Sequence, residues 1–160
     1  MISEDVIMPS EPRWRFFTDQ VMGGLSTGGL VFVTEDGVAF ARMTGHVSTA
    51  NRGGFIQIRQ ALTASPPPGT LGVRLIARGN GQRYFVHLRT ESTALPWQYY
   101  QAGFDVTEDW REIRLALDAF SATGGMSNRL PEAGRLTSIA VVAYGRDHEA
   151  RIDLREVGFY

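Results

Sequence analysis

The 160-residue chain contains no cysteine and no lysine. Without cysteine, disulfides, thiolate catalysis and cysteine-bound metal sites are all excluded. Without lysine, the chain has no Walker-type phosphate lysine, no Schiff-base lysine and no lysine general base. All sixteen basic residues are arginine, so the strong cations of this protein are planar guanidinium groups suited to bidentate hydrogen bonds.

The chain also lacks an excess of charge and a long apolar run. Its net charge is -1, which gives no general attraction to nucleic acid or anionic membranes, so we expect no nucleic-acid partner. The longest purely apolar run, residues 139–144, is far shorter than the roughly 20 residues that span a bilayer, so we expect no direct membrane insertion. Residues 1–12 carry three acidic residues and no arginine, unlike a signal or transit peptide, which predicts a cytoplasmic protein.

What is present is an alternation of apolar and polar residues with a period of two. Residues 71–77, 84–88 and 113–117 follow this pattern, and about nine such runs come after Leu30. Half-buried antiparallel strands have this alternation. The sequence therefore predicts an all-β fold of about eight to nine antiparallel strands, a β-sandwich or jelly roll with little helix. Because no linker or internal repeat interrupts the pattern, we expect residues 1–160 to form a single domain.

Glycine, proline, asparagine and aspartate separate these runs. The Gly79-Asn80-Gly81 stretch lies between two alternating segments, and its residues suit left-handed backbone angles. It predicts a β-hairpin that joins the two neighbouring strands. Helix is expected only as a turn or two, at residues 117–122 and 130–135.

Two glycine pairs lie beside polar side chains. The residues of these two loops are Asp19, Gly23, Gly24, Ser26, Ser48, Asn51, Gly53 and Gly54. Glycine allows the backbone to approach other groups closely, so we expect two structural loops that meet in space. Asp19 and Asn51 should hydrogen-bond backbone amides there. A ligand-binding role for the loops is the alternative, although neither glycine pair fits a phosphate-loop pattern.

No catalytic constellation is evident. The three histidines, His46, His87 and His148, show no zinc-ligand spacing, and no set of serine, histidine and acid stands out as a catalytic triad. We therefore expect no enzyme, with acid–base chemistry by His46 or His87 as the remaining alternative. No cofactor is expected, although acids near predicted strand ends leave a structural calcium ion open. These acids are Asp105, Glu108, Asp109, Asp118 and Asp153.

The polar phase of three consecutive predicted strands is rich in arginine, and aromatic residues accompany it. The candidate binding residues are Arg59, Arg74, Phe85, His87, Arg89, Trp97 and Tyr99, with Gln57, Arg78 and Tyr100 beside them. If their strands lie in one sheet, they form a face suited to planar, anionic or sugar-like partners, or to the acidic groups of a protein. If the strands alternate between two sheets, the cluster separates. A solvated sheet face is the alternative interpretation.

Several segments together resemble a known family. They are Trp14-x-Phe16-x-x-Asp19-x-Val21-Met22-Gly23-Gly24-x-Ser26, Phe40-x-x-x-x-Gly45-x-Val47-Ser48-x-x-Asn51-x-Gly53-Gly54-Phe55 with Arg59, Trp97-x-Tyr99-Tyr100 with Phe104, Trp110-x-x-Ile113-x-Leu115-x-Leu117-x-x-Phe120, and Ile152-x-Leu154-x-x-Val157. On these residues the chain is similar, over nearly its whole length, to the complex I intermediate-associated protein thirty family. Trp14 and Met22 of the first segment are expected to be structural, like the residues of the glycine-pair loops.

That resemblance implies a galactose-binding-domain-like jelly roll, similar to some carbohydrate-binding modules. Mitochondrial members of the family are chaperone-like factors that assist assembly of NADH:ubiquinone oxidoreductase, and the family offers no established catalytic residues. The chain lacks a mitochondrial N-terminal extension, so it resembles a stand-alone bacterial-type member. A shared fold transfers more securely than a shared function.

Two functions follow as expectations. The first is a non-enzymatic binding or assembly module with a protein partner, such as a respiratory-complex subunit or an assembly factor. The second is a carbohydrate- or small-ligand-binding module in which Trp97, Tyr99 and Tyr100 stack on sugar rings. The absence of an export signal counts against the second function.

Overall fold

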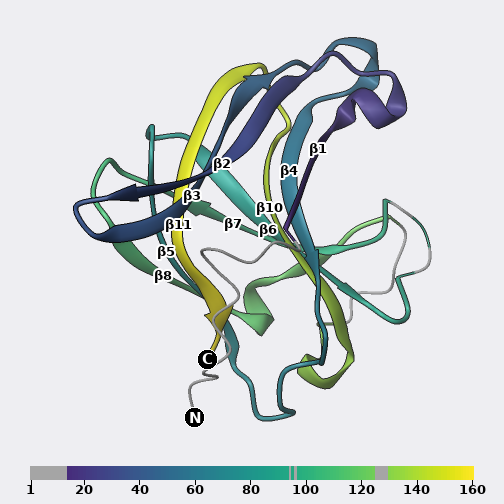
Figure 1. Cartoon of the computed structure of the whole chain (residues 1–160). Coiled ribbons are helices and arrows are strands. Elements are labelled where there is room, and N and C mark those ends of the chain that lie inside the picture. Colours follow the sequence, from purple (N-terminus) through teal and green to yellow (C-terminus); the bar gives the residue numbers. More distant parts are fainter. Residues whose placement is uncertain (1–13, 94, 96, 125–129) are drawn as a thin grey trace.

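A computed structural model describes residues 14–93, 95, 97–124 and 130–160 of the chain. The described residues form eleven strands in two sheets that pack face to face (Figure 1). The six-stranded sheet has the order β1 (Arg15–Thr18), β4 (Phe55–Ala61), β10 (Leu136–Tyr144), β6 (Arg83–Thr90), β7 (Tyr100–Asp105) and β9 (Ser121–Ala122). The five-stranded sheet has the order β2 (Thr27–Glu35), β3 (Val38–Val47), β11 (His148–Phe159), β5 (Gly72–Gly79) and β8 (Arg111–Ala116). Every strand pairing in both sheets is antiparallel.

The expected fold class is confirmed. About nine strands were expected from Leu30 onward, and the described residues carry eleven, of which β1 has four residues and β9 has two. The helices of the described residues are short 3-10 turns: η1 (Asp19–Met22), η2 (Ala50–Arg52), η3 (Leu117–Ala119) and η4 (Ala133–Arg135). None of these described helices has the length and apolar character needed to cross a membrane.

The core lies between the two sheets, and the alternation along each strand selects the side chains that fill it. Ile56 and Ile58 of β4, Ile139 and Val141 of β10 and Ile152 of β11 are fully buried in one continuous cluster. Complete burial of such a side chain contributes roughly 1.5–3 kcal/mol to stability. The side chains between them in sequence point away from the core, so the composition of the two outer faces is free to serve other purposes.

The predicted hairpin at Gly79-Asn80-Gly81 is wrong. The strands on its two sides, β5 and β6, belong to different sheets, so this turn crosses the sandwich. Asn80 is held by β11 rather than by a hairpin: its backbone N–H donates to the carbonyl of Arg151 and its side chain donates to the carbonyl of Glu149. The side-chain oxygen of Asn80 also accepts a hydrogen bond from the Tyr84 hydroxyl.

The outer face of the five-stranded sheet carries a network of ion pairs. Asp153 of β11 is fully buried there and pairs with Arg42 of β3 and Arg78 of β5, each at 2.8 Å. Burial alone would raise the pKa of Asp153, but the hydrogen bonds from Arg42 and Arg78 outweigh burial and hold that pKa below its usual value. The guanidinium of Arg78 is further fixed over the ring of Trp110, 4.5 Å from its centroid. The arginines of this face therefore stabilise the sheet.

A candidate ligand groove on the six-stranded sheet

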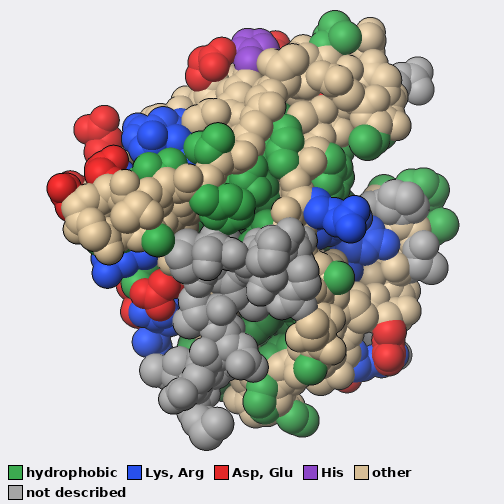
Figure 2. Space-filling view, viewed as in Figure 1, with side chains coloured by type: hydrophobic (Ala, Val, Ile, Leu, Met, Phe, Trp, Pro, Cys, Tyr) green, Lys and Arg blue, Asp and Glu red, His purple; other side chains and the backbone are tan. Residues whose placement is uncertain are grey.

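The outer face of the six-stranded sheet is hollowed into a groove of about 450 Å³. A volume of this size is typical of sites for small ligands. The floor consists of Ser138, Ala140 and Val142, the outward-facing residues of the central strand β10. Because these side chains are small and those of the flanking strands are long, the middle of the sheet lies lower than its sides. Figure 2 shows the molecule hollowed at its right edge, with arginine side chains beside the hollow.

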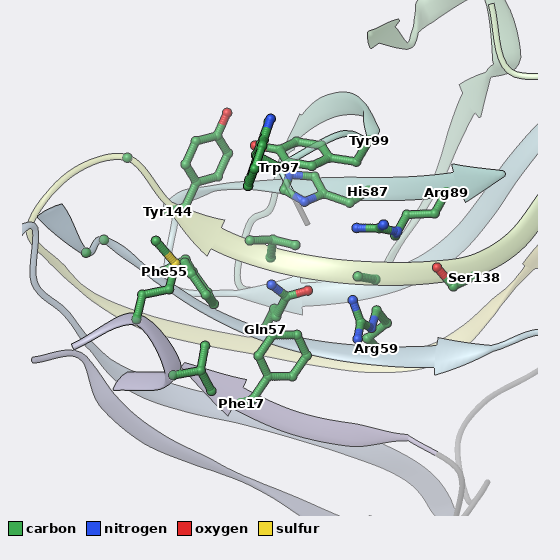
Figure 3. A pocket seen from close by; sticks show the side chains of 17 residues that line it. Phe17, Phe55, Gln57, Arg59, His87, Arg89, Trp97, Tyr99, Ser138 and Tyr144 are labelled. Atoms are coloured by element: carbon green, nitrogen blue, oxygen red, sulfur yellow. The ribbon is translucent and has the colours of Figure 1, made fainter. Parts of the chain in front are cut away.

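Aromatic and amide side chains from the flanking strands form the walls (Figure 3). Phe17 of β1 and Phe55 and Gln57 of β4 line one side, and the rings of Phe17 and Phe55 meet edge to face at 6.1 Å. His87 of β6 and Tyr99, which precedes β7, line the other side. The walls are therefore largely apolar, with polar groups at separate points.

Exposed apolar side chains stand on both rims of the groove. Val21 and Met22 of η1 are 70% and 63% exposed, and Trp97, in the segment between β6 and β7, is 58% exposed on the opposite rim. Exposed apolar side chains that gather around one hollow, rather than lying singly on the surface, commonly mark a surface that binds another molecule.

His87 lies beneath Tyr99 in the second wall. The two rings are stacked, with centroids 3.9 Å apart and an angle of 16° between their planes. Burial lowers the pKa of His87 to about 3, although a hydrogen bond with Gln101 acts in the opposite direction. The ring is therefore neutral at neutral pH, whereas a general acid or base needs a pKa near the working pH. This environment favours a binding role over acid–base chemistry at His87.

Two arginines supply the positive charge of the groove. Arg59 of β4 lies over the ring of Phe17, 5.0 Å from its centroid, and Arg89 of β6 donates from Nη2 to the carbonyls of Thr93 and Leu95 at 3.0 and 3.1 Å. Burial, together with the neighbouring charge of Arg59, lowers the pKa of Arg89. Among the described residues that line the groove, none is acidic. The two cations therefore face the groove without a carboxylate from its lining.

The two glycine-pair loops meet around Asp19, and Gly53 and Gly54 of the second loop line the groove. The Asp19 carboxylate is fully buried and accepts hydrogen bonds from the backbone N–H of Ser26 at 2.9 Å and from the Ser26 hydroxyl at 2.6 Å. It also accepts from the backbone N–H groups of Gly54 and Phe55. Burial alone would raise the pKa of Asp19, but these hydrogen bonds outweigh it and hold the pKa below its usual value.

Close packing around this carboxylate explains the glycines. A Cβ atom at Gly24 or Gly53 would overlap the Asp19 carboxylate, and Gly54 has a φ of +128°. Gly23 ends η1 with a φ of +85°, in the left-handed region that favours glycine. The expectation that the two loops meet, with Asp19 accepting from backbone amides, is confirmed.

Two other polar residues take different parts in the same loops. The backbone N–H of Ser48 donates to the hydroxyl of Ser26 at 2.9 Å, which links the second loop to the first. Asn51 does not accept from a backbone amide as expected; its side-chain amide donates to the carbonyl of Gly23 at 3.3 Å. Asn51 itself adopts a left-handed conformation with a φ of +56°, which asparagine tolerates better than most residues.

Most of the candidate binding residues come together in the groove. Those that line it are Arg59, His87, Arg89, Trp97 and Tyr99. Phe85 lies on the same face of β6, where its ring packs on Tyr144 with centroids 4.6 Å apart. Arg74 does not join them: it lies on β5 in the five-stranded sheet and pairs with Glu112 at 2.9 Å and Glu156 at 3.1 Å.

Of the residues expected to be structural, some lie in the core or the loops and others line the groove. Trp14 is buried in the core, in agreement with a structural role. Met22, Gly53 and Gly54 line the groove, so their segment of the motif contributes to the candidate site as well as to the loops. The sequence pattern alone did not separate these two positions.

Several residues that line the groove are not among the candidate binding residues predicted from the sequence. They are Phe17, Val21, Phe55, Ser138, Ala140, Val142, Tyr144 and Gly145. Residues 139–144 are apolar at every position, whereas the other strands alternate between apolar and polar residues. This continuous run is the sequence pattern that indicates a strand with both faces covered, as β10 has.

The described residues provide no metal centre, since no three histidine or acidic side chains among them lie close enough to hold an ion. Of the acids considered for calcium, Asp153 is the buried one, and it is already neutralised by arginine.

Comparison with known proteins gives a family and a fold. The family model described as complex I intermediate-associated protein 30 matches residues 5–148. No curated protein sequence matches the chain.

Among solved structures, the chain is similar to carbohydrate-binding modules. A family 11 module of the cellulosomal cellulase Lic26A-Cel5E of Clostridium thermocellum superposes with a TM-score of 0.79 at 10% identity, covering 99% of this chain and 94% of the module. A family 11 module of the same species, in complex with a beta-1,3-1,4-mixed-linked tetrasaccharide, gives a TM-score of 0.75 at 12% identity, with coverages of 99% and 93%. A family 30 carbohydrate-binding module gives 0.61 at 13% identity, with coverages of 86% and 91%. At these identities the likeness shows the fold, a jelly roll of the galactose-binding type.

Proposed function

Because the chain belongs to the complex I intermediate-associated protein 30 family, we propose that it is a non-enzymatic binding module that assists assembly of NADH:ubiquinone oxidoreductase or of another membrane protein complex. In this proposal, the groove of the six-stranded sheet receives part of a protein partner, such as a respiratory-complex subunit or an assembly factor.

The composition of the groove is the observation that carries the proposal. Tryptophan, methionine and arginine are enriched in protein–protein interfaces, and Trp97, Met22 and Arg59 are exposed around this one groove. The stacked, neutral His87 supports binding rather than acid–base catalysis at the same place.

The test is genetic and uses the source organism. Deletion of the gene should lower the amount of assembled NADH:ubiquinone oxidoreductase, or of another membrane complex, on native gels, and the wild-type gene should restore it. Trp97→Ala should restore the complex poorly because it removes an exposed ring from the groove rim. Leu71→Ala is the matched control, since Leu71 is 66% exposed and does not line the groove. Unchanged levels of all membrane complexes in the deletion strain would contradict the proposal.

Carbohydrate binding is the second candidate, and a specific observation favours it. The exposed ring of Trp97 and the rings of Tyr99 and Tyr144 line the groove, and aromatic rings stack on the apolar faces of sugars. The fold is also that of carbohydrate-binding modules, one of which was solved with a mixed-linked tetrasaccharide. A glycan array, followed by calorimetry of any hit against wild type and Trp97→Ala, tests this function. The absence of any hit at millimolar sugar would remove it.

A further inference from the structure

The charges of the groove are concentrated at one end. Arg59 and Arg89 lie on the two strands that flank β10, and Figure 3 shows their guanidinium groups on opposite sides of the floor, near Ser138. Contacts with Phe17 and with the Thr93 and Leu95 carbonyls hold the two side chains in place. Two pre-positioned guanidinium groups beside a hydroxyl group form a receptor for a carboxylate.

The other part of the groove is apolar. Val142 forms its floor, and the exposed side chains of Met22 and Trp97 stand on its two rims. A large apolar side chain placed over Val142 would cover all three residues. Met22 and the neighbouring Val21 are aliphatic, so this rim offers apolar side-chain packing to a bound segment.

The spacing of the two parts matches an extended peptide. Val142 and Ser138 are four residues apart on one strand, and a strand rises about 3.3 Å per residue, so the two parts are about 13 Å apart. An extended peptide has nearly the same rise and would bring residues about four positions apart to the two parts.

We propose that the groove binds an extended acidic segment of a partner protein. The carboxylate of that segment lies between Arg59 and Arg89, and a large apolar side chain about four residues away lies over Val142 between Met22 and Trp97. This inference rests on the proposed function and names the chemistry of the partner.

The test selects peptides on the full chain. A displayed library of random dodecapeptides is selected against the wild-type protein, and the most enriched peptide is synthesised together with a version in which its acidic residues are replaced by their amides. Enriched peptides should pair an acidic residue with a large apolar one about four positions away. Calorimetry should show that the amide version binds at least about tenfold more weakly.

Two variants locate the binding. Arg59→Gln should weaken the acidic peptide about tenfold and leave the amide version nearly unchanged, because only the acidic peptide uses that charge. Arg114→Gln is the matched control: it also removes one exposed positive charge, but from β8 of the other sheet, and should leave both affinities within about twofold.

Three outcomes would overturn the inference. In the first, the enriched peptides carry no acidic residues. In the second, Arg59→Gln and Arg114→Gln change the affinity for the acidic peptide equally. In the third, no peptide is enriched and the groove binds polygalacturonate, an acidic polysaccharide. Failure of the proposed function would give a different combination of results. In that case the acidic peptide binds through Arg59, while the gene deletion leaves the membrane complexes at their normal levels.

Discussion

Arginine occupies the outer faces of both sheets, but its neighbours differ. On the five-stranded sheet, Arg42 and Arg78 enclose the buried carboxylate of Asp153. In the groove of the six-stranded sheet, Arg59 and Arg89 face a floor of small residues, and no acid is among the described lining residues. In the first arrangement carboxylates lie between the arginines, whereas the second places two guanidinium groups beside a lining that has no acidic residue among those described.

The difference shows that the role of an outward-facing arginine is set by the strands beside it. Arg74 and Arg59 follow the same alternation, yet Arg74 lies between Glu112 of β8 and Glu156 of β11, while Arg59 lies beside Phe17 of β1. The two faces should therefore respond differently to the same kind of substitution.

The largest effect is expected at Asp153. Asp153→Ala should lower the free energy of unfolding by about 3 kcal/mol, because it removes the carboxylate that Arg42 and Arg78 share and leaves Arg78 only its more exposed pair with Glu35. Asp105→Ala is the control, since its pair with Arg83 is exposed and should contribute less than about 1 kcal/mol. Urea unfolding measures both. Equal losses from the two variants would mean that the five-stranded face is no more dependent on its charges than an ordinary surface.

The next largest effect is expected at Asp19, the acid that borders the groove but is enclosed by the loops. Asp19→Ala should cost about 1–3 kcal/mol, since it leaves the buried backbone N–H groups of Ser26 and Gly54 without their acceptor. Any loss of ligand binding should follow from that loss of stability, which thermal unfolding measures. If the variant keeps its melting temperature but no longer binds a ligand, the loops themselves form a recognition site.

A pH titration should report the burial of His87 in the groove wall. The pKa of His87 is lowered from 6.5 to about 3 on folding, so the unfolded state takes up the proton first. Stability is therefore fully present above about pH 6.5 and is lost as pH falls toward 3, by up to about 1.4 kcal/mol per pH unit. The contribution of Asp153, whose pKa is held below 3.8, should be lost only at lower pH.

His87→Gln tests this assignment. The variant should flatten the fall in stability between pH 6 and pH 4.5, measured by urea unfolding at several pH values. His148, whose pKa is also lowered mainly by burial, adds to the same slope, so part of the fall should persist. A slope identical to that of wild type would show that His87 is not the group that titrates.

The smallest effect on stability is expected at Arg59. Arg59→Ala should change the free energy of unfolding by less than about 0.5 kcal/mol, because no described carboxylate pairs with it. Arg74→Ala, which breaks two ion pairs on the other sheet, should cost about 1 kcal/mol. If the two variants are destabilised equally, Arg59 has a structural role and the contrast between the faces fails.

The sequence predicted the fold more completely than the site. Alternation depends on neighbouring residues in the chain, so it located the strands and their core-facing phase, as with Ile56 and Ile58. The assignment of strands to sheets depends on distant partners, and alternation carries no information about it. This is why the Gly79-Asn80-Gly81 stretch predicts a hairpin although β5 and β6 belong to different sheets.

The same limit explains which site residues could be found. Arg59 and His87 were placed in one cluster from their shared phase, and the structure brings them together through β10, which follows them by more than forty residues in the chain. Arg74 shared that phase but belongs to the other sheet. Ala140 and Val142 carry no chemical signal of their own, because what matters at the floor is that they are smaller than their neighbours.

The order of the strands has a consequence for how the protein is made. The last two strands, β10 and β11, each occupy an interior position: β10 lies between β4 and β6, and β11 lies between β3 and β5. A nascent chain that has not yet extended past Leu136 therefore has neither sheet complete, however much of it has left the ribosome. Its pairing edges stay open until β10 and β11 have been made, and open strand edges are prone to aggregate. A premature stop before Leu136 would remove one interior strand from each sheet, and with β10 it would remove the floor of the groove.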